Sequence, residues 1–406
     1  MSRRVLLVLP TSTYRASAFL AAARRLGLEV VVASEEPSTL RSLHPGGELL
    51  INLSHPELAP DRLVELQEAE EIAAVVAADE SGVLVAAHLA WVLQLPGNPP
   101  VAAAATRDKA RLRDRLRLAE IAQPRWAIWA HEDPPAWELF PAVLKPLDQA
   151  ASRGVVRANA PVELPPAGAR VRQLLAAGCG PERAAVPRPL LVEEFVPGPE
   201  VAVEALISGG NLIPLAIYDK PDPLDGPYFE ETIYTVPTVL PPARQEAVRQ
   251  TVAAAVGALG LTTGPVHAEL RLGWDDPVLI DLASRSIGGH CSSVLHFRQG
   301  QTLEELILLQ ALGEPLPDPE LEAGGAGVMM LPIPRAGRLL EVSGREGALA
   351  VPGVESLEIA VPLGTSIAPP PEGDRYLGFM FARGTDGPDA ARALRLAHSQ
   401  LRFEID

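Results

Sequence analysis

The chain has 406 residues, a formal net charge of −16 at pH 7 and 47% hydrophobic residues, so it can bury large cores in two or three domains. It has no run of Lys or Arg, which argues against nucleic acid as the main partner, because binding to a phosphate backbone depends on basic charge. No apolar stretch reaches the ~18 residues of a membrane span, so no membrane partner is expected. The two cysteines, Cys179 and Cys291, predict no disulfide framework and a cytoplasmic location.

Residues 1–106 are predicted to form an N-terminal α/β domain. Short apolar runs alternate with longer amphipathic ones: strands at 4–10, 28–34 and 72–79, and helices at 16–27 and 82–95. This alternation predicts an open, mostly parallel sheet of the Rossmann-like kind. No G-x-G-x-x-G motif follows the first strand, so a dinucleotide-binding dehydrogenase is not supported.

Residues 107–200 are predicted to form linker helices and a small domain. A charged helix at 106–126 carries Lys109, and a short apolar strand at 141–147 delivers Lys145 to a loop. The loop offers a hydroxyl, backbone N–H groups and one flexible residue, which suit a flap over phosphate groups: Ser152, Arg153 and Gly154. Surface lysines and an ordinary loop are the alternative interpretation.

The segment at 189–208 is typical of a strand, a Pro-Gly break and a second strand. The break leaves backbone donors and acceptors free at an apolar edge, where a flat heterocycle such as adenine could bind. The residues at this edge are Glu193, Glu194, Phe195 and Val196. Glu200, beyond the break, is placed to bind ribose hydroxyls. Two strands joined by a simple turn would account for the same pattern.

Residues 201–406 are predicted to form the largest domain, strand-rich from about 324. Within it, a hairpin at 266–289 has a first arm in which four apolar residues alternate with polar ones: Val266, Ala268, Leu270 and Leu272. In the second arm the expected apolar face consists of Val278, Ile280 and Leu282.

If the hairpin turn centres on Asp275, Glu269 and Asp281 face each other about 5 Å apart, where like charges are destabilising. A divalent cation would convert this repulsion into coordination, because Mg²⁺ prefers oxygen ligands and often takes one or two carboxylates plus substrate phosphates. Solvated acids on a hairpin face are the alternative.

The order of these features resembles that of the ATP-grasp superfamily. Four stretches are similar to those of ATP-dependent carboxylate–amine ligases related to the L-amino-acid ligases: "KPLDQAASRGV", "VEEFVPGPEVAVE", "GPVHAELRL" and "DLASRSIGG". The resemblance implies an ATP-grasp fold, with an N-terminal Rossmann-like domain, a small lid domain and a C-terminal antiparallel-sheet domain with a β-rich tail. It also implies a reaction in which ATP phosphorylates a carboxylate and an amine attacks the acyl phosphate, releasing ADP and phosphate.

The resemblance further implies roles for particular residues. Lys109 and Lys145 would contact ATP phosphates, and Arg285 would lie over the transferring phosphoryl group, so that Lys145 and Arg285 are the expected catalytic residues. Glu269 and Asp281 would hold Mg²⁺, with Mn²⁺ as an alternative ion.

The same resemblance places Ser152, Arg153 and Gly154 in the lid loop. It implies that Glu193 and Val196 offer backbone groups to adenine, and that Glu200 lies near the ribose. Two positions depart from the family pattern. Asp281 stands where Glu is usual, and Ala283 stands where Asn is frequent.

The substrates are expected to be a small-molecule carboxylate and an amine, one of them a free α-amino acid. The segment at 216–237 and the turn after Arg285 supply the candidate substrate-binding residues: Lys220, Glu230, Glu231, Gly288, Gly289 and His290. The glycine turn would hold a carboxylate at a helix N-terminus. A solvated loop would equally account for the charges of 216–237, and a hydrogen-bonded structural role is favoured for His267.

Other functions within and beyond this superfamily stay open. They are a biotin-carboxylase-like enzyme, a purine-biosynthetic ATP-grasp enzyme and a non-catalytic ATP-binding regulatory protein. Biotin carboxylases carry a Glu base four residues after the arginine, where this chain has Gly289. A homodimer is the assembly considered.

Overall fold

The computed structural model describes residues 3–11, 13–37, 46–66, 71–177, 188–273, 276–373 and 375–406. Cys179 and Asp275, the expected centre of the hairpin turn, lie outside the described residues. In the part of the chain that is described, the strands form four sheets, and no helix is long and apolar enough to span a bilayer.

The N-terminal sheet is parallel, as predicted. Its strands are β1 (Arg4–Val8), β2 (Glu29–Ser34), β3 (Glu48–Leu50) and β4 (Ile72–Ala77), in the order β3-β2-β1-β4. The helical segments around it are α1 (Ala16–Arg25), η2 (Pro56–Glu65), η4 (Glu80–Gly82) and α2 (Val83–Val92). The strands are apolar on both faces, because α1 packs against one face of the sheet and α2 packs against the other. Since η4 begins just beyond the carboxyl end of β4, it presents Glu80 at the edge where ligands bind in such sheets.

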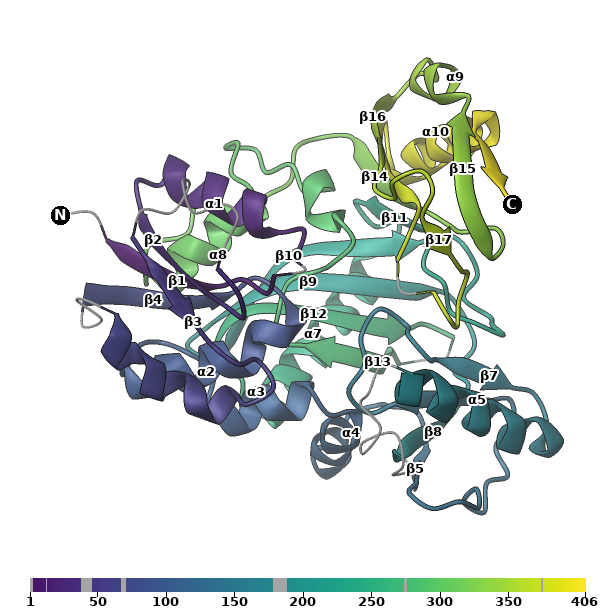
Figure 1. Cartoon of the computed structure of the whole chain (residues 1–406), viewed down its shortest axis with the longest axis horizontal. Coiled ribbons are helices and arrows are strands. Elements are labelled where there is room, and N and C mark those ends of the chain that lie inside the picture. The colour runs from purple at the N-terminus through teal and green to yellow at the C-terminus, as the bar shows by residue number, and fades with distance from the viewer. Residues whose placement is uncertain are drawn as a thin grey trace.

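A small antiparallel sheet forms the lid, at the lower right of Figure 1. Its strands are β5 (Trp126–Trp129), β6 (Ala142–Pro146), β7 (Val156–Ala158) and β8 (Leu190–Glu194), in the order β5-β8-β6-β7. One face is covered by η5 (Pro161–Glu163) and α5 (Leu164–Ala177). Gly168 of α5 lies against Trp129 so closely that a Cβ there would come within 2.2 Å of the indole ring. The strand predicted at 141–147 is β6, and it carries Lys145.

The prediction of a single helix over 106–126 is wrong in its bounds. α3 (Pro100–Thr106) ends where that helix was expected to begin, and α4 (Lys109–Leu118) starts after Asp108. The Asp108 carboxylate accepts hydrogen bonds from the N–H groups of α4's first turn and so caps a separate helix.

Helix α4 packs its apolar side chains against the largest domain and contacts the lid through the Arg113–Glu193 ion pair. Its buried side chains Leu112 and Leu116 join the core beneath the central sheet. We retain the division into 1–106, 107–200 and 201–406 as a proposal, with α4 as the segment that anchors the lid to the third part.

The largest sheet has eight strands in the order β13-β12-β9-β10-β11-β14-β18-β16. Their bounds are β9 (Glu200–Ser208), β10 (Asn211–Lys220), β11 (Ile233–Val236), β12 (Thr263–Arg271), β13 (Val278–Ala283), β14 (Gly325–Leu331), β16 (Val354–Ile359) and β18 (Gly378–Gly384). Helix α7 (Pro242–Leu259) packs against one face and α8 (Leu303–Ala311) against the other, and η6 (Cys291–Val294) follows β13.

The tail is β-rich, as expected. Strands β15 (Gly337–Ser343), β17 (Ser366–Ile367) and β19 (Arg402–Ile405) form a three-stranded sheet beside α9 (Arg345–Leu349) and α10 (Gly387–Gln400), at the upper right of Figure 1. Because β14 and β18 belong to the eight-stranded sheet, the tail is continuous with the central domain.

Strands β12 and β13 form the predicted hairpin, and Glu269 pairs with Asp281 as expected. One step further along, Leu270 pairs with Leu279, so Ile280 is an extra residue and the ladder is bulged.

Because of the bulge, the prediction that Val278, Ile280 and Leu282 share one apolar face is wrong. Leu279 and Leu282 enter the core, whereas Ile280 lies beside Asp281 on the wall of a cavity. Arg113 of α4 holds the bulge, because its guanidinium donates hydrogen bonds to the carbonyl oxygens of Leu279 and Ile280.

Candidate active site

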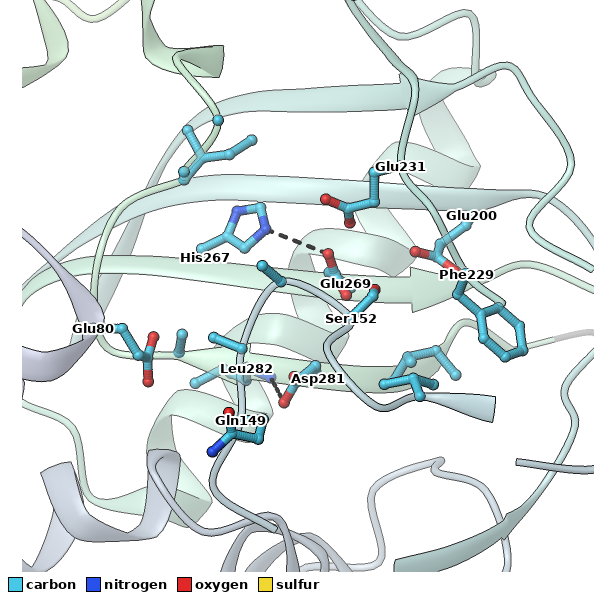
Figure 2. Close-up of a pocket in the computed structure, with 18 of the residues that line it drawn as sticks. Glu80, Gln149, Ser152, Glu200, Phe229, Glu231, His267, Glu269, Asp281 and Leu282 are labelled. Atoms are coloured by element: carbon cyan, nitrogen blue, oxygen red, sulfur yellow. Dashed lines mark hydrogen bonds and ion pairs between the residues drawn. The ribbon is translucent and has the colours of Figure 1, made fainter. Parts of the chain in front are cut away.

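A cavity of about 300 Å³ lies between the N-terminal sheet, the lid and the central sheet. Its walls come from the loop after β4, from α4, from β6 and β8 with the segments that follow them, and from β12 and β13 (Figure 2). Fourteen of the predicted residues line it: Lys109, Lys145, Ser152, Glu193, Glu194, Phe195, Val196, Glu200, Glu231, Glu269, Asp281, Arg285, Gly288 and Gly289. The structure thus brings together residues from most of the chain.

Two lysines each pair with an acid of this cavity. Lys109 Nζ lies 3.0 Å from Asp281 Oδ2 and donates to the carbonyl oxygen of Gln149. Lys145 Nζ lies 2.8 Å from Glu193 Oε2. Both ammonium groups are on the cavity wall, where they can balance the charge of phosphate oxygens.

The segment after β8 lines the cavity, and its backbone N–H groups differ in whether they are paired. The N–H of Phe195 donates to Pro141, whereas the N–H of Val196 makes no hydrogen bond among the described residues. The Glu193 side chain is buried between Arg113 and Lys145. Burial alone would raise the pKa of Glu193, but these two positive charges outweigh it and hold the pKa below its ordinary value. The Glu193 carboxylate is therefore a structural anion.

The loop after β6 has an unusual backbone. Ala151 and Ser152 have φ values of 53° and 54°, and Gly154 has 72°. Ser152 lines the cavity, while Arg153 and Gly154 are not part of its wall. A left-handed backbone at two residues other than glycine costs energy, which is common in ligand clamps.

Glu269 and Asp281 face the same cavity and are both held as anions. Burial would raise the pKa of Glu269, but the charge of Lys220 and a hydrogen bond from His267 hold it well below the ordinary value. Burial opposes ionisation of Asp281 too, and the charges of Lys109 and Lys145 lower its pKa.

His267 forms the hydrogen bond expected of a structural histidine, but it also touches a predicted metal ligand. Its Nδ1 lies 3.3 Å from Glu204 Oε2. Its Nε2 lies 3.7 Å from Glu269 Oε1, the contact that Figure 2 shows. Glu204 is fully buried, and this burial raises its pKa. The sequence pattern did not identify Glu204, which lies on the neighbouring strand β9.

Lys220 was expected to bind substrate, and the structure places it elsewhere. It does not line the cavity, because its Nζ lies beneath the wall, 2.6 Å from Glu200, 2.8 Å from Glu231 and 2.9 Å from Glu269. Glu200 also pairs with Arg271, at 2.7 Å. The Lys220 ammonium is therefore buried and contacts three protein carboxylates.

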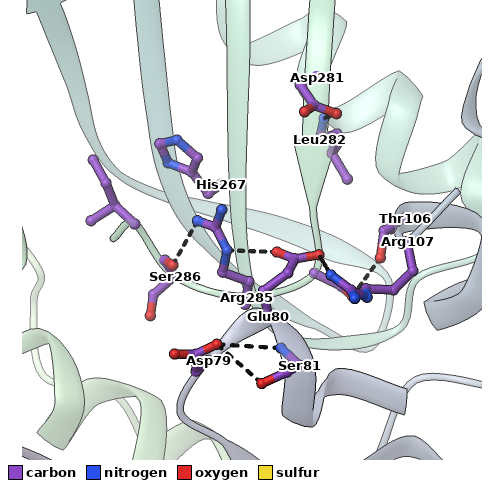
Figure 3. A network of polar contacts seen from close by, with 12 residues as sticks. Asp79, Glu80, Ser81, Thr106, Arg107, His267, Asp281, Leu282, Arg285 and Ser286 are labelled. Carbon is purple, nitrogen blue, oxygen red and sulfur yellow. Dashed lines mark hydrogen bonds and ion pairs between the residues drawn. The ribbon is translucent and has the colours of Figure 1, made fainter. Parts of the chain in front are cut away.

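Arg285 is held by Glu80, which the sequence pattern did not identify. Figure 3 shows the Glu80 carboxylate between Arg285 Nε and Arg107 Nη1, each 2.7 Å away. Burial would raise the pKa of Glu80, but the two guanidinium charges lower it. An acidic residue directly after a parallel strand is a position from which such a role could have been predicted.

The other predicted substrate residues are divided between two places. Gly288 and Gly289 line the main cavity, and the N–H of Gly289 donates to the Tyr14 hydroxyl. His290 instead lines a neighbouring cavity and packs against the rings of Tyr14 and Phe379. Glu230 lines neither cavity. The helix expected after this turn is η6, a single 3-10 turn, so it offers no helix N-terminus of useful length.

The acids on this wall fit a divalent cation. Glu269 and Asp281 oppose each other in the ladder, and both are ionised at neutral pH. Lys220 and His267 approach Glu269 through Oε1, so Oε2 forms no hydrogen bond or ion pair among the described residues. Two carboxylates of this kind, completed by phosphate oxygens and water, suit Mg²⁺.

Three family models match successive parts of the chain. The ATP-grasp N-terminal domain matches residues 20–97, the ATP-grasp domain matches 138–294, and the L-amino acid ligase C-terminal domain 2 matches 329–406. The chain therefore belongs to the ATP-grasp superfamily, as its fold and site indicated. Within that superfamily it is an ATP-grasp ligase with a tail of the L-amino acid ligase type.

Three proteins are similar to this chain over different shares of its length. An uncharacterized protein, y4rH, from Sinorhizobium fredii is 27% identical over 99% of this chain and 83% of its own length. Carnosine synthase 1 of Gallus gallus is 32% identical over 35% of this chain and 16% of its own length. The crystal structure of an L-amino acid ligase from Bacillus licheniformis has a TM-score of 0.80 and 24% identity, covering 100% of this chain and 99% of that one. The last likeness shows the shared fold.

Proposed function

We propose that this protein is an ADP-forming carboxylate–amine ligase that makes an amide or peptide bond through an acyl phosphate, with an amino acid as one substrate. The proposal rests on one observation: three cationic side chains and two acids line the same cavity. They are Lys109, Lys145, Arg285, Glu269 and Asp281. Cations and paired acids in this arrangement suit phosphoryl transfer, which needs positioning and charge stabilisation more than covalent protein chemistry. The L-amino acid ligase tail supports an amino-acid substrate.

In the first proposed step, a carboxylate oxygen of the substrate attacks the γ-phosphorus of ATP, and ADP leaves. In the second, the amine nitrogen attacks the acyl carbon, the C–N bond forms, the amine loses a proton, and phosphate leaves with the carboxylate's oxygen. Lys109, Lys145 and Arg285 offset the charge of the phosphoryl oxygens. The loop around Ser152 excludes water, which would otherwise hydrolyse the acyl phosphate.

Mg²⁺ or Mn²⁺, when bound by Glu269 and Asp281, would neutralise negative charge on the phosphate oxygens. The backbone of Val196 would receive adenine, and Glu200 lies on the wall toward which the ribose would extend. At the far end of the cavity, Glu231 and the Gly288–Gly289 turn are the proposed contacts for the amine and carboxylate substrates.

The first test of this function is product analysis. The protein is incubated with ATP, Mg²⁺ and pools of amino acids, and the expected products, ADP and phosphate, should appear only when a suitable carboxylate is present. Hydroxylamine should divert the acyl phosphate to a hydroxamate whose mass identifies that carboxylate. AMP and pyrophosphate would contradict the proposal, and a regulatory ATP-binding protein would give no product with any pool.

The metal assignment has its own test. Glu269→Gln removes one anionic ligand without changing the size of the side chain, and phosphate release should fall by about two orders of magnitude. Circular dichroism checks that the variant is folded. Unchanged turnover with unchanged Mg²⁺ dependence would remove Glu269 from the metal site.

A further inference from the structure

Lys220 is surrounded by three carboxylates beneath the cavity. Its Nζ contacts Glu200, Glu231 and Glu269 at 2.6, 2.8 and 2.9 Å, and 3% of its side chain is exposed. The three acids come from the start of β9, from the segment before β11 and from β12. One oxygen of each lies within 4.8 Å of the others, a grouping that could hold a metal ion.

The geometry requires a compact cation at this place. An ammonium has three N–H donors on one atom, and here each donor has one carboxylate. Composition agrees with this requirement: the 35 basic residues include three lysines, Lys109, Lys145 and Lys220, and the rest are arginines. Three carboxylates around one nitrogen suit the ammonium of Lys220 better than a planar guanidinium, whereas Lys109 and Lys145 each pair with one acid of the cavity wall.

We propose that Lys220 is a built-in cation that fills a three-carboxylate site and acts as a positioning residue for the catalytic cavity. It holds Glu269 by Oε1, so that Oε2 faces the cavity, and it holds Glu231 against the neighbouring wall. It also keeps a divalent ion out of the space between the three acids. The role of Glu269 in this inference rests on the proposed function, whereas the occupation of the acid cluster by Lys220 does not.

Metal binding without nucleotide provides the decisive test. Lys220→Ala leaves Glu200, Glu231 and Glu269 around an open space, so this variant should bind one more Mn²⁺ per chain than the wild type, as counted by electron paramagnetic resonance. Lys220→Ala combined with Glu231→Gln is the matched control and should lose the additional ion. Equal Mn²⁺ counts in the wild type and Lys220→Ala would overturn the proposal.

If Lys220→Ala does not fold in metal-free buffer, refolding it with and without Mn²⁺ applies the same test. We expect Lys220→Ala to fold in the presence of Mn²⁺, and a variant that stays unfolded with Mn²⁺ would contradict the proposal. The Mn²⁺ count needs no substrate, so it decides the inference even if no ligase activity is found.

Turnover tests the positioning role separately. Lys220→Arg keeps the charge but not the three-donor geometry, and phosphate release should fall by about 10- to 100-fold, as for other groups that orient metal ligands. The binding of ADP, measured without metal, should change much less. Wild-type turnover in Lys220→Arg would show that charge alone suffices and would refute the positioning role.

Discussion

Glu80 connects the N-terminal domain to the arginine of the active site. One oxygen of its carboxylate pairs with Arg285 and the other pairs with Arg107. The Arg285 side chain is 17% exposed. Arg285 also donates through Nη1 to the Ser286 carbonyl oxygen. Two of its nitrogens are therefore occupied by the protein, which orients the guanidinium toward the cavity.

Glu80→Gln should lower kcat for phosphate release by about a hundredfold while the KM for ATP changes little, because a small misplacement of a catalytic group has an effect of that size. Steady-state kinetics over a range of ATP concentrations measures both. Arg107→Met is the control: it removes the partner of the other oxygen, does not alter the cavity wall, and should retain most of the rate. An unchanged kcat in Glu80→Gln would contradict the positioning of Arg285 by Glu80.

The buried carboxylate of Glu193 is expected to contribute to the free energy of unfolding in a pH-dependent way. Because its pKa is depressed in the folded state, its contribution to stability is present above the pKa of the unfolded chain and is lost as the pH falls through the folded value. Glu193→Gln leaves Arg113 and Lys145 buried without their anion, which should lower the free energy of unfolding at neutral pH by about 3–5 kcal/mol.

Urea denaturation at a series of pH values measures this effect. The difference between the wild type and Glu193→Gln should shrink below about pH 4, where the glutamate of the unfolded chain takes up its proton. Glu194→Gln is the neighbouring control: Glu194 pairs with Arg125, whose side chain is 69% exposed, so a loss of less than about 1 kcal/mol is expected. Equal losses in the two variants would contradict the buried-anion account of Glu193.

At the scale of elements, the lid is attached to the segment that carries Glu231. The N–H of Arg157 in β7 donates to the Pro227 carbonyl oxygen, and Val156 forms a β-bridge with Tyr228. The Tyr228 ring also packs against the lid core. Nucleotide binding under the lid should therefore order both segments together.

Hydrogen exchange with and without ADP tests this coupling. Residues 148–155 and residues 224–232 should both become more protected when the nucleotide is bound. Lys145→Ala, which weakens the contact with phosphate, should reduce both changes in parallel. Protection confined to the loop at 148–155 would show that the lid moves independently of the substrate segment.

The sequence pattern predicted these elements unequally well. Strand alternation placed Glu269 opposite Asp281 because pairing in a hairpin depends on positions counted from the turn. It did not predict the extra residue Ile280, because the bulge depends on Arg113, which is distant in sequence and donates to the bulge carbonyls. The extent of α4 was missed for a local reason, the capping role of Asp108.

The residues that sequence reasoning missed share a physical property: each acts through a partner far away in the chain. Glu80 meets Arg285 across 205 positions, and Glu204 meets His267 across 63. Lys220 was identified as part of the site, but its burial among three acids follows from the packing of β9, β10 and β12 and not from its own neighbours in sequence. Periodicity describes single elements and does not contain such contacts.

On the scale of the whole molecule, each part contributes a wall to one cavity. The N-terminal domain supplies Glu80 and Tyr14, the lid supplies Lys145, and the central sheet supplies the acids. The tail supplies Met330 of β14 and Tyr376, beside the proposed substrate end. The L-amino acid ligase tail therefore completes the enclosure in which the substrates are proposed to react. A homodimer and a cytoplasmic location remain predictions from the sequence.

If the carboxylate substrate is activated as an acyl phosphate, one of its oxygens must leave with the phosphate, and isotope labelling can follow that oxygen. The carboxylate identified by hydroxamate trapping is prepared with ¹⁸O in its carboxyl group and incubated with ATP, Mg²⁺ and the amine. We expect each released phosphate to carry one ¹⁸O, because the attacking carboxylate oxygen leaves with the phosphoryl group. Phosphate without ¹⁸O, or label found in AMP, would contradict activation as an acyl phosphate.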